Sequence, residues 1–233
     1  MANFCSNCGK ETNHKVMFCN RCSFFPDKGF PGLPLSEDLM MEKAINFLEN
    51  DKYEEALSYL DIILAEEPEN FPVLKYKGYA LKFLNRHEEA CIFFDKALAI
   101  NQDDINLLYH KGILLDEQEM YEEAVNCFER AMELEPSFIP PIVYKGISLT
   151  ALKKYEEGIE NFDRALKLDE NNVSALESKG VSLFALKRYE EAIECLDRAL
   201  ELDPENVDNL SCKGWCLLAL GKYEEAMRCV NIE

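Results

Sequence analysis

The feature that most constrains this chain is a sequence repeat with a period of 34 residues. A glycine recurs at that spacing at Gly78, Gly112, Gly146, Gly180 and Gly214. A second signature, most often Tyr-Glu-Glu-Ala, keeps the same step from residue 53 to residue 223, and an alanine recurs at 97, 131, 165 and 199. Because three signatures share one period, the chain is predicted to consist of repeated structural units. The units span 37–70, 71–104, 105–138, 139–172, 173–206 and, incompletely, 207–233.

Each unit contains two apolar stretches with the spacing of a helix face. In the unit 105–138 the first stretch carries Leu107, Leu108, Leu114 and Leu115, and the second carries Ala124, Cys127, Phe128 and Ala131. Short polar links separate the two stretches, and proline and asparagine mark the junctions between units. Each unit is therefore predicted to be a helical hairpin. One hairpin cannot bury both of its faces, so neighbouring hairpins should stack into a superhelix.

The repeated glycine needs a physical reason, since a glycine inside a helix costs about 1 kcal/mol relative to alanine. Close approach of the two helices of a hairpin supplies one. We expect the glycine of the first helix to face a small residue of the second helix, such as Ala90 or Ala124. Large side chains at both places would push the two helices apart.

The repeat unit resembles the tetratricopeptide repeat family. The unit 105–138 matches the family pattern at Leu108, Gly112, Leu115, Tyr121, Ala124, Phe128, Ala131 and Pro136. This resemblance covers 37–233 and implies an all-α, right-handed superhelical solenoid of about six hairpins. Local departures are His87 in place of Tyr, Gly158 in place of Ala, and Ala44 in place of the glycine. The last unit stops within its second helix, so we expect a partner or a second copy to cover that end, or the chain to be a fragment of a longer protein.

The resemblance implies that the first helix of each hairpin lines a concave groove. The side chains three positions before, one after, and four and five after each glycine share one helical stripe. The predicted partner-binding groove contains Lys75, Tyr79, Lys82, Phe83, Tyr109, Ile113, Val143, Ile147, Val181, Phe184, Trp215 and Leu218. Such a largely apolar and aromatic groove, with charge towards its N-terminal end, is predicted to bind a peptide or a partner helix. The alternative for aliphatic residues such as Ile113 is that they only pack between hairpins.

A lysine precedes each repeated glycine, and an acidic residue recurs at the same period. The lysines are Lys77, Lys111, Lys145, Lys179 and Lys213, and the acids are Asp61, Asp95, Glu129, Asp163 and Asp197. We expect the lysine stems to lie across the packing between hairpins and the ammonium groups to pair with these acids. The alternative is a track of lysines that binds anions.

Four cysteines near the N-terminus have the spacing C-x2-C-x10-C-x2-C and are predicted to bind one structural Zn²⁺. They are Cys5, Cys8, Cys19 and Cys22. Two such pairs complete the tetrahedron of thiolates that Zn²⁺ prefers, and they leave no position open for a catalytic water. Residues 1–25 resemble a zinc ribbon, which is too short to fold on a core of its own, so the metal should supply its folding free energy. Residues 26–36 are expected to form a linker.

Composition and charge narrow the function classes. The net charge of −19 disfavours binding to nucleic-acid phosphates, although the ribbon, with its phenylalanines and few basic residues, leaves that alternative open. No apolar run is long enough to cross a membrane and the N-terminus is unlike a signal peptide, so a cytoplasmic location without a membrane partner is expected. The six other cysteines, scattered through helical stretches, are read as small buried hydrophobes.

The sequence predicts an interaction scaffold and not an enzyme. It has no phosphate-binding loop, nucleotide fingerprint or nucleophile elbow, and only three histidines. The predicted function is therefore binding of a protein or peptide in the groove. Two alternatives remain open at this stage: a nucleic-acid-associated accessory factor that uses the ribbon, and a regulatory fragment of a larger protein. A homo-oligomer through the last hairpin is also possible.

Overall fold

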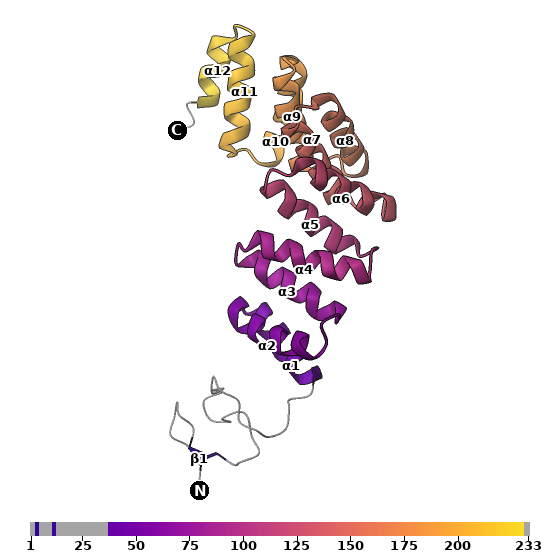
Figure 1. Ribbon diagram of the computed structural model, residues 1–233. Coiled ribbons are helices and arrows are strands. Elements are labelled where there is room, and N and C mark those ends of the chain that lie inside the picture. Colours follow the sequence, from indigo (N-terminus) through magenta and orange to yellow (C-terminus); the bar gives the residue numbers. More distant parts are fainter. Residues whose placement is uncertain (1–2, 5–10, 13–36, 231–233) are drawn as a thin grey trace. The chain divides into compact units, whose positions relative to one another are not determined.

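The computed structural model describes residues 3–4, 11–12 and 37–230, and it divides into two compact units, 1–68 and 69–233. In the first unit, strands β1 (Asn3–Phe4) and β2 (Glu11–Thr12) pair antiparallel, with Asn3 opposite Thr12. The same unit contains the hairpin of α1 (Glu37–Glu49) and α2 (Tyr53–Glu66) (Figure 1). The four cysteines of the predicted zinc site, and the predicted linker, lie outside the described residues.

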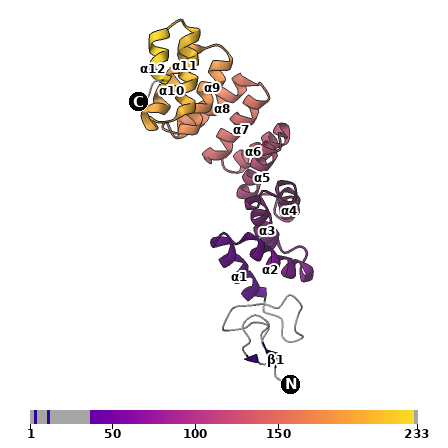
Figure 2. The same cartoon turned by 90° about the vertical axis from the view of Figure 1, so that its left-hand side faces the viewer.

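The second unit is a stack of five helical hairpins. In chain order these are α3 (Phe71–Phe83) with α4 (His87–Ile100), α5 (Ile105–Glu117) with α6 (Tyr121–Leu134), α7 (Ile139–Ala151) with α8 (Tyr155–Leu168), α9 (Val173–Ala185) with α10 (Tyr189–Leu202), and α11 (Val207–Ala219) with α12 (Tyr223–Val230). Each hairpin packs on the next along the chain (Figures 1 and 2). The first helices α5, α7, α9 and α11 also contact one another in turn, and α3 contacts α5 through the side chains of Tyr79, Lys82 and His110. The five first helices of the second unit therefore form one row. The predicted all-α solenoid of hairpins is confirmed for the helical residues.

Polar caps and left-handed turns set the ends of the helices at the repeat period. Asn70, Asp104, Asn172 and Asn206 each accept a hydrogen bond from the backbone N–H three residues later, at 2.9–3.2 Å. Within the hairpins the chain turns through residues with positive φ, and these recur every 34 residues at Asp51, Asn85, Glu119, Lys153, Lys187 and Gly221. The sequence therefore marks locally where α3, α5, α9 and α11 begin and where the first helix of each hairpin ends.

Gly78, Gly112 and Gly146 each face a phenylalanine ring and Gly180 faces Leu196, so the prediction that the repeated glycines face small residues was wrong at these four positions. A Cβ built on Gly112 would lie 2.5 Å from the ring of Phe128, and one built on Gly146 would lie 2.5 Å from the ring of Phe162. Both rings are fully buried. Helical side chains lean towards the N-terminus of their own helix, so the residue one turn after Ala124 covers the glycine. The glycine thus makes room for the ring that fills the hairpin.

The same geometry explains why Gly158 replaces the usual alanine in α8. A Cβ at Gly158 would lie 2.7 Å from Oγ1 of Thr150 and 3.0 Å from the carbonyl oxygen of Gly146. The Thr150 hydroxyl donates to that same carbonyl at 2.9 Å and contacts the hydroxyl of Ser182 at 2.9 Å. In this hairpin the side chain of a threonine on the first helix occupies the space that an alanine methyl group would need.

The repeated lysines pair with the repeated acids, which confirms that prediction at four positions. Lys111 pairs with Asp95, Lys145 with Glu129 at 2.8 Å, Lys179 with Asp163 at 2.5 Å and Lys213 with Asp197 at 2.5 Å. Each pair joins the first helix of one hairpin to the second helix of the preceding hairpin. The acids are about half exposed, so each pair contributes roughly 0–1 kcal/mol, and their shared role is to align neighbouring hairpins.

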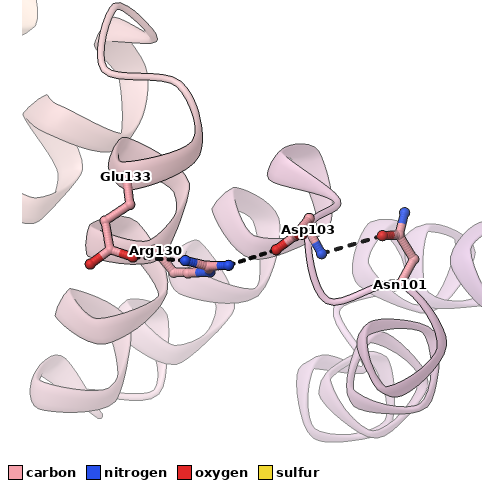
Figure 3. Close-up of polar contacts among 4 residues, drawn as sticks. All are labelled: Asn101, Asp103, Arg130 and Glu133. Carbon is pink, nitrogen blue, oxygen red and sulfur yellow. Dashed lines mark hydrogen bonds and ion pairs between the residues drawn. The ribbon is translucent and has the colours of Figure 1, made fainter.

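A second set of polar contacts ties each junction loop to the hairpin that follows it. Arg130 of α6 donates to Asp103 at 2.7 Å, in the loop between α4 and α5, and to Glu133 at 2.9 Å, while the Asn101 side chain accepts from the Asp103 N–H (Figure 3). The equivalent arginines of the next two hairpins, Arg164 and Arg198, donate to backbone carbonyl oxygens of the preceding junctions at 3.0 and 2.7 Å. Sequence reasoning missed this set, although the 34-residue step between the arginines was visible.

We predict that Gly112→Ala lowers the free energy of unfolding by about 1–2 kcal/mol, because overpacking against Phe128 outweighs the gain in helix propensity. The matched control is Gly214→Ala, since a Cβ there would meet only ordinary contacts, the nearest at 3.7 Å from Cys229. This control should keep the wild-type stability or exceed it by up to about 1 kcal/mol. Urea denaturation followed by circular dichroism measures both, and equal shifts in the two variants would contradict the packing argument.

Candidate functional site

The row of first helices exposes apolar side chains that the core does not use. Phe83 on α3 is 58% exposed, Val181 on α9 is 47% exposed, and Trp215 and Leu218 on α11 are 62% and 41% exposed. All four belong to the predicted groove. They extend over α3, α9 and α11 of the second unit, which gives a partner several separate points of apolar contact.

The other predicted groove residues are mostly half-buried. These are Lys75, Tyr79, Lys82, Tyr109, Ile113, Ile147 and Phe184. Val143 is the exception, because it is only 3% exposed and belongs to a core cluster with Met132 and Ile142. The equivalent residues of other hairpins, such as Lys75 and Tyr109, are longer and reach the surface. The side chain of Val143 is short, so it ends in the interface between hairpins and does not line the groove.

Charge is concentrated where α3 meets α5. Lys75 forms an ion pair with Asp104 at 2.7 Å, and the Lys82 ammonium lies 3.0 Å from Nδ1 of His110. Tyr79 contacts the imidazole ring edge-on, with ring centroids 5.1 Å apart. Burial, together with the positive charges of Lys82 and Lys75, lowers the pKa of His110 to about 4. The imidazole is therefore neutral at pH 7 and accepts a hydrogen bond from Lys82, whose own pKa is lowered by burial.

An aromatic cluster occupies the next junction. Tyr109 of α5 contacts Phe138 and Tyr144, each with ring centroids 5.6 Å apart in an edge-on arrangement. Burial raises the pKa of Tyr109 to about 12. These rings pack against Phe128 of the core, so at this junction the face is continuous with the hydrophobic interior.

A cavity of about 300 Å³ opens between α7, α9 and α11. Its lining combines the apolar Ile147 and Val181, the hydroxyls of Thr150 and Ser178, the amides of Asn206 and Asn209, and the carboxylates of Glu177 and Asp208. A second hollow, of about 200 Å³, lies on the last hairpin among Ser211, Trp215, Leu218 and Met227. Sequence reasoning identified Ile147, Val181, Trp215 and Leu218 in these two places but not Met227. It treated Asn206 only as a marker of the junction between units and did not single out Asn209.

The described residues offer no metal centre, and five of their thiols are buried enough to have raised pKa values. No group of three or more His, Cys, Asp or Glu residues within 37–230 could hold a metal ion. The cysteines of the helices are free, and burial raises the pKa of Cys91, Cys127, Cys195, Cys212 and Cys216. Those five thiols are therefore protonated at neutral pH, in keeping with packing roles. Among the helices of the described part, none is long and apolar enough to cross a bilayer.

Comparison with protein families identifies the repeat. Four models described as tetratricopeptide repeat match the chain, one at 41–105, one at 105–138 and 173–206, one at 145–172 and one at 195–228. Together they span most of the helical part. The chain belongs to the tetratricopeptide repeat family. A search of curated proteins found no match.

Solved tetratricopeptide repeat structures share the fold at low sequence identity. A repeat protein from Parabacteroides merdae is 20% identical with a TM-score of 0.75, over 84% of this chain and 77% of that one. YrrB, described as having an unusual peptide-binding site, is 23% identical with a TM-score of 0.69, over 75% of this chain and 90% of its own. MamA from Desulfovibrio magneticus RS-1 is 24% identical with a TM-score of 0.69, over 73% and 96% of the two chains.

We predict that His110 stays neutral at pH 5.5, where a histidine with an ordinary pKa is mostly protonated. Because the folded pKa lies below the unfolded one, the contribution of His110 to stability is full above about pH 6.5 and declines as the pH falls towards 4. An imidazole ¹H–¹⁵N spectrum measures its titration, with His110→Gln to assign the signal. A midpoint near 6.5 would show that the contacts with Lys82 and Tyr79 do not hold the ring in solution.

Proposed function

We propose that this tetratricopeptide repeat protein is a non-enzymatic scaffold that binds a peptide or a helix of another protein along the row of first helices. The observation that carries the proposal is the exposure of Phe83, Val181, Trp215 and Leu218 on that row. Full burial of a large apolar side chain contributes about 1.5–3 kcal/mol, so covering the exposed half of one of these residues contributes about half of that. Since they project from three helices, α3, α9 and α11, an elongated partner can bury several of them at once.

The remaining chemistry of the face favours binding over catalysis. The lysines that precede the glycines are paired with acids, and His110 is held neutral between Lys82 and Tyr79, where it serves packing and hydrogen bonding. The peptide-binding site named for YrrB supports a ligand of this kind. We place the scaffold in the cytoplasm, where its free thiols would remain reduced.

The binding face is tested with a matched pair of variants. Val181 on α9 and Leu202 on α10 are similarly exposed, at 47% and 44%, but only Val181 lies on a first helix. With the full chain as bait in native lysate, Val181→Glu should lose at least tenfold of the retained partner, because a charge replaces a desolvated contact. Leu202→Glu should retain it. Equal retention by both variants, measured by quantitative mass spectrometry, would place the binding surface elsewhere.

We also propose that Cys5, Cys8, Cys19 and Cys22 bind one structural Zn²⁺. The support is the spacing of the four thiols, and the position of Cys5 and Cys8 in the segment that joins β1 to β2. When bound, the ion would supply folding free energy and no reaction chemistry.

The zinc proposal predicts one Zn²⁺ per chain, measured by inductively coupled plasma mass spectrometry on protein purified without added metal. Cys5→Ser and Cys19→Ser should each lose the metal, because a site with three thiolates binds Zn²⁺ more weakly. Cys91→Ser on α4 is the control and should keep it. Metal retained at full stoichiometry by both N-terminal variants would contradict the assignment.

A further inference from the structure

The cavity between α7, α9 and α11 contains a carboxylate that hydrogen bonds hold in place. Glu177 of α9 accepts hydrogen bonds on Oε1 from the side-chain amides of Asn206 at 3.0 Å and Asn209 at 2.6 Å. Asn209 is 3% exposed, and Asn206 is itself fixed because its carbonyl oxygen caps α11. The carboxylate of Glu177 is therefore held in place by two neutral donors, both of which bond the same oxygen.

No cation neutralises this carboxylate. Within the described residues, neither Glu177 nor Asp208, the other acid of the cavity, forms an ion pair. The neighbouring lysines are already engaged, because Lys179 of α9 pairs with Asp163 of α8 and Lys213 of α11 pairs with Asp197 of α10. The cavity thus contains two carboxylates that no lysine or arginine of the described helices neutralises, and a cationic group would complement them.

The positions of Glu177 and Asn206 can be compared with the equivalent positions of other repeats. Three repeats earlier, the positions of Glu177 and Asn206 are occupied by Lys75 and Asp104, which form an ion pair at 2.7 Å and neutralise each other. One repeat after that pair, the same positions hold Tyr109 and Phe138, which contact through their rings. The geometry of the junction is thus kept while its chemistry changes, and only the pair of Glu177 and Asn206 leaves a net charge.

The walls of the cavity suit an aliphatic stem next to a cationic head. Ile147 and Val181 supply apolar surface, and Val181 is 47% exposed. The hydroxyls of Thr150 and Ser178 lie in the same lining. Lysine and arginine bury their methylene groups against apolar surface while their charged ends seek carboxylates. A guanidinium also forms a planar fork that can bond a carboxylate and a second acceptor together.

We propose that this cavity binds a basic side chain of the partner peptide, with arginine preferred over lysine, and that Glu177 and Asp208 bind its charged end. The inference rests on the proposed function, since it names the chemistry of one position in the bound segment. The peptide carries an apolar residue beside the basic one, to contact Val181 or the nearby surface of α11.

The first test is selection of a random twelve-residue peptide library displayed on phage, with the full chain immobilised. Peptides bound by the wild type should be enriched in arginine next to an apolar residue. The synthetic form of a selected peptide should bind Glu177→Gln and Asp208→Asn about tenfold more weakly, and replacement of its arginine by citrulline should have the same effect. Glutamine at 177 can still accept from both asparagines, so Glu177→Gln keeps the local structure.

The control separates this cavity from the general acidity of the chain. Glu194→Gln removes one charge from an exposed position of α10 and should leave the affinity unchanged. Equal weakening by Glu194→Gln and Glu177→Gln, or selected peptides without a basic residue, would overturn the inference and leave the scaffold function standing. Selection of no peptide by the wild type would contradict the scaffold function as well.

Discussion

In four of the five hairpins of the second unit, the glycine of the first helix contacts a large side chain of the second helix, and this contact is the interaction on which the array depends. The rings of Phe94, Phe128 and Phe162 are fully buried, and each lies in the space that a Cβ atom on the facing glycine would occupy. A helix pair that interlocks in this way has a fixed spacing, so every hairpin presents the same surface to the next. The ion pairs of Lys145 and Lys179 and the contacts of Arg164 and Arg198 can then recur with the same geometry at successive junctions.

This regularity frees the positions on the exposed row to vary. Lys75 with Asp104, Tyr109 with Phe138 and Glu177 with Asn206 occupy equivalent places and form an ion pair, an aromatic contact and a hydrogen-bonded carboxylate. Tyr109 also packs on Phe128 of its own hairpin, and Asp104 and Asn206 cap the helices that follow them, so the junctions differ in chemistry while the hairpins keep the same fold. A face that has the same geometry but different side chains at each junction is suited to recognising an elongated ligand, with a different residue of the ligand at each junction.

The fold could be predicted from the sequence because its main constraints are periodic and local. The spacing of Leu107, Leu108 and Leu114 marks a helix face, and Asn172 and Asn206 mark helix starts, without reference to any distant residue. The partner of Gly112 could not be predicted in the same way, because a spacing shows which face a residue lies on but not how far a side chain leans across the interface. The prediction for Val143 was wrong for a related reason. Val143 lies on the predicted face of the helix, but its side chain is too short to reach the surface. The cavity around Glu177 depends on Asn209, which occupies the position of Leu107 three repeats later. A polar residue that replaces an apolar one in a single repeat produces no periodic pattern, so the sequence did not reveal it.

The most direct test of the binding face is hydroxyl-radical footprinting of the protein with and without its captured partner. The account predicts that the partner protects Phe83, Val181, Trp215 and Leu218 of the first helices, which are 41–62% exposed in the free chain. Ile92, Leu168 and Leu202 of the second helices are exposed to a similar degree and should be oxidised equally in both states. Protection of the second-helix residues, with the first-helix residues unchanged, would contradict the account.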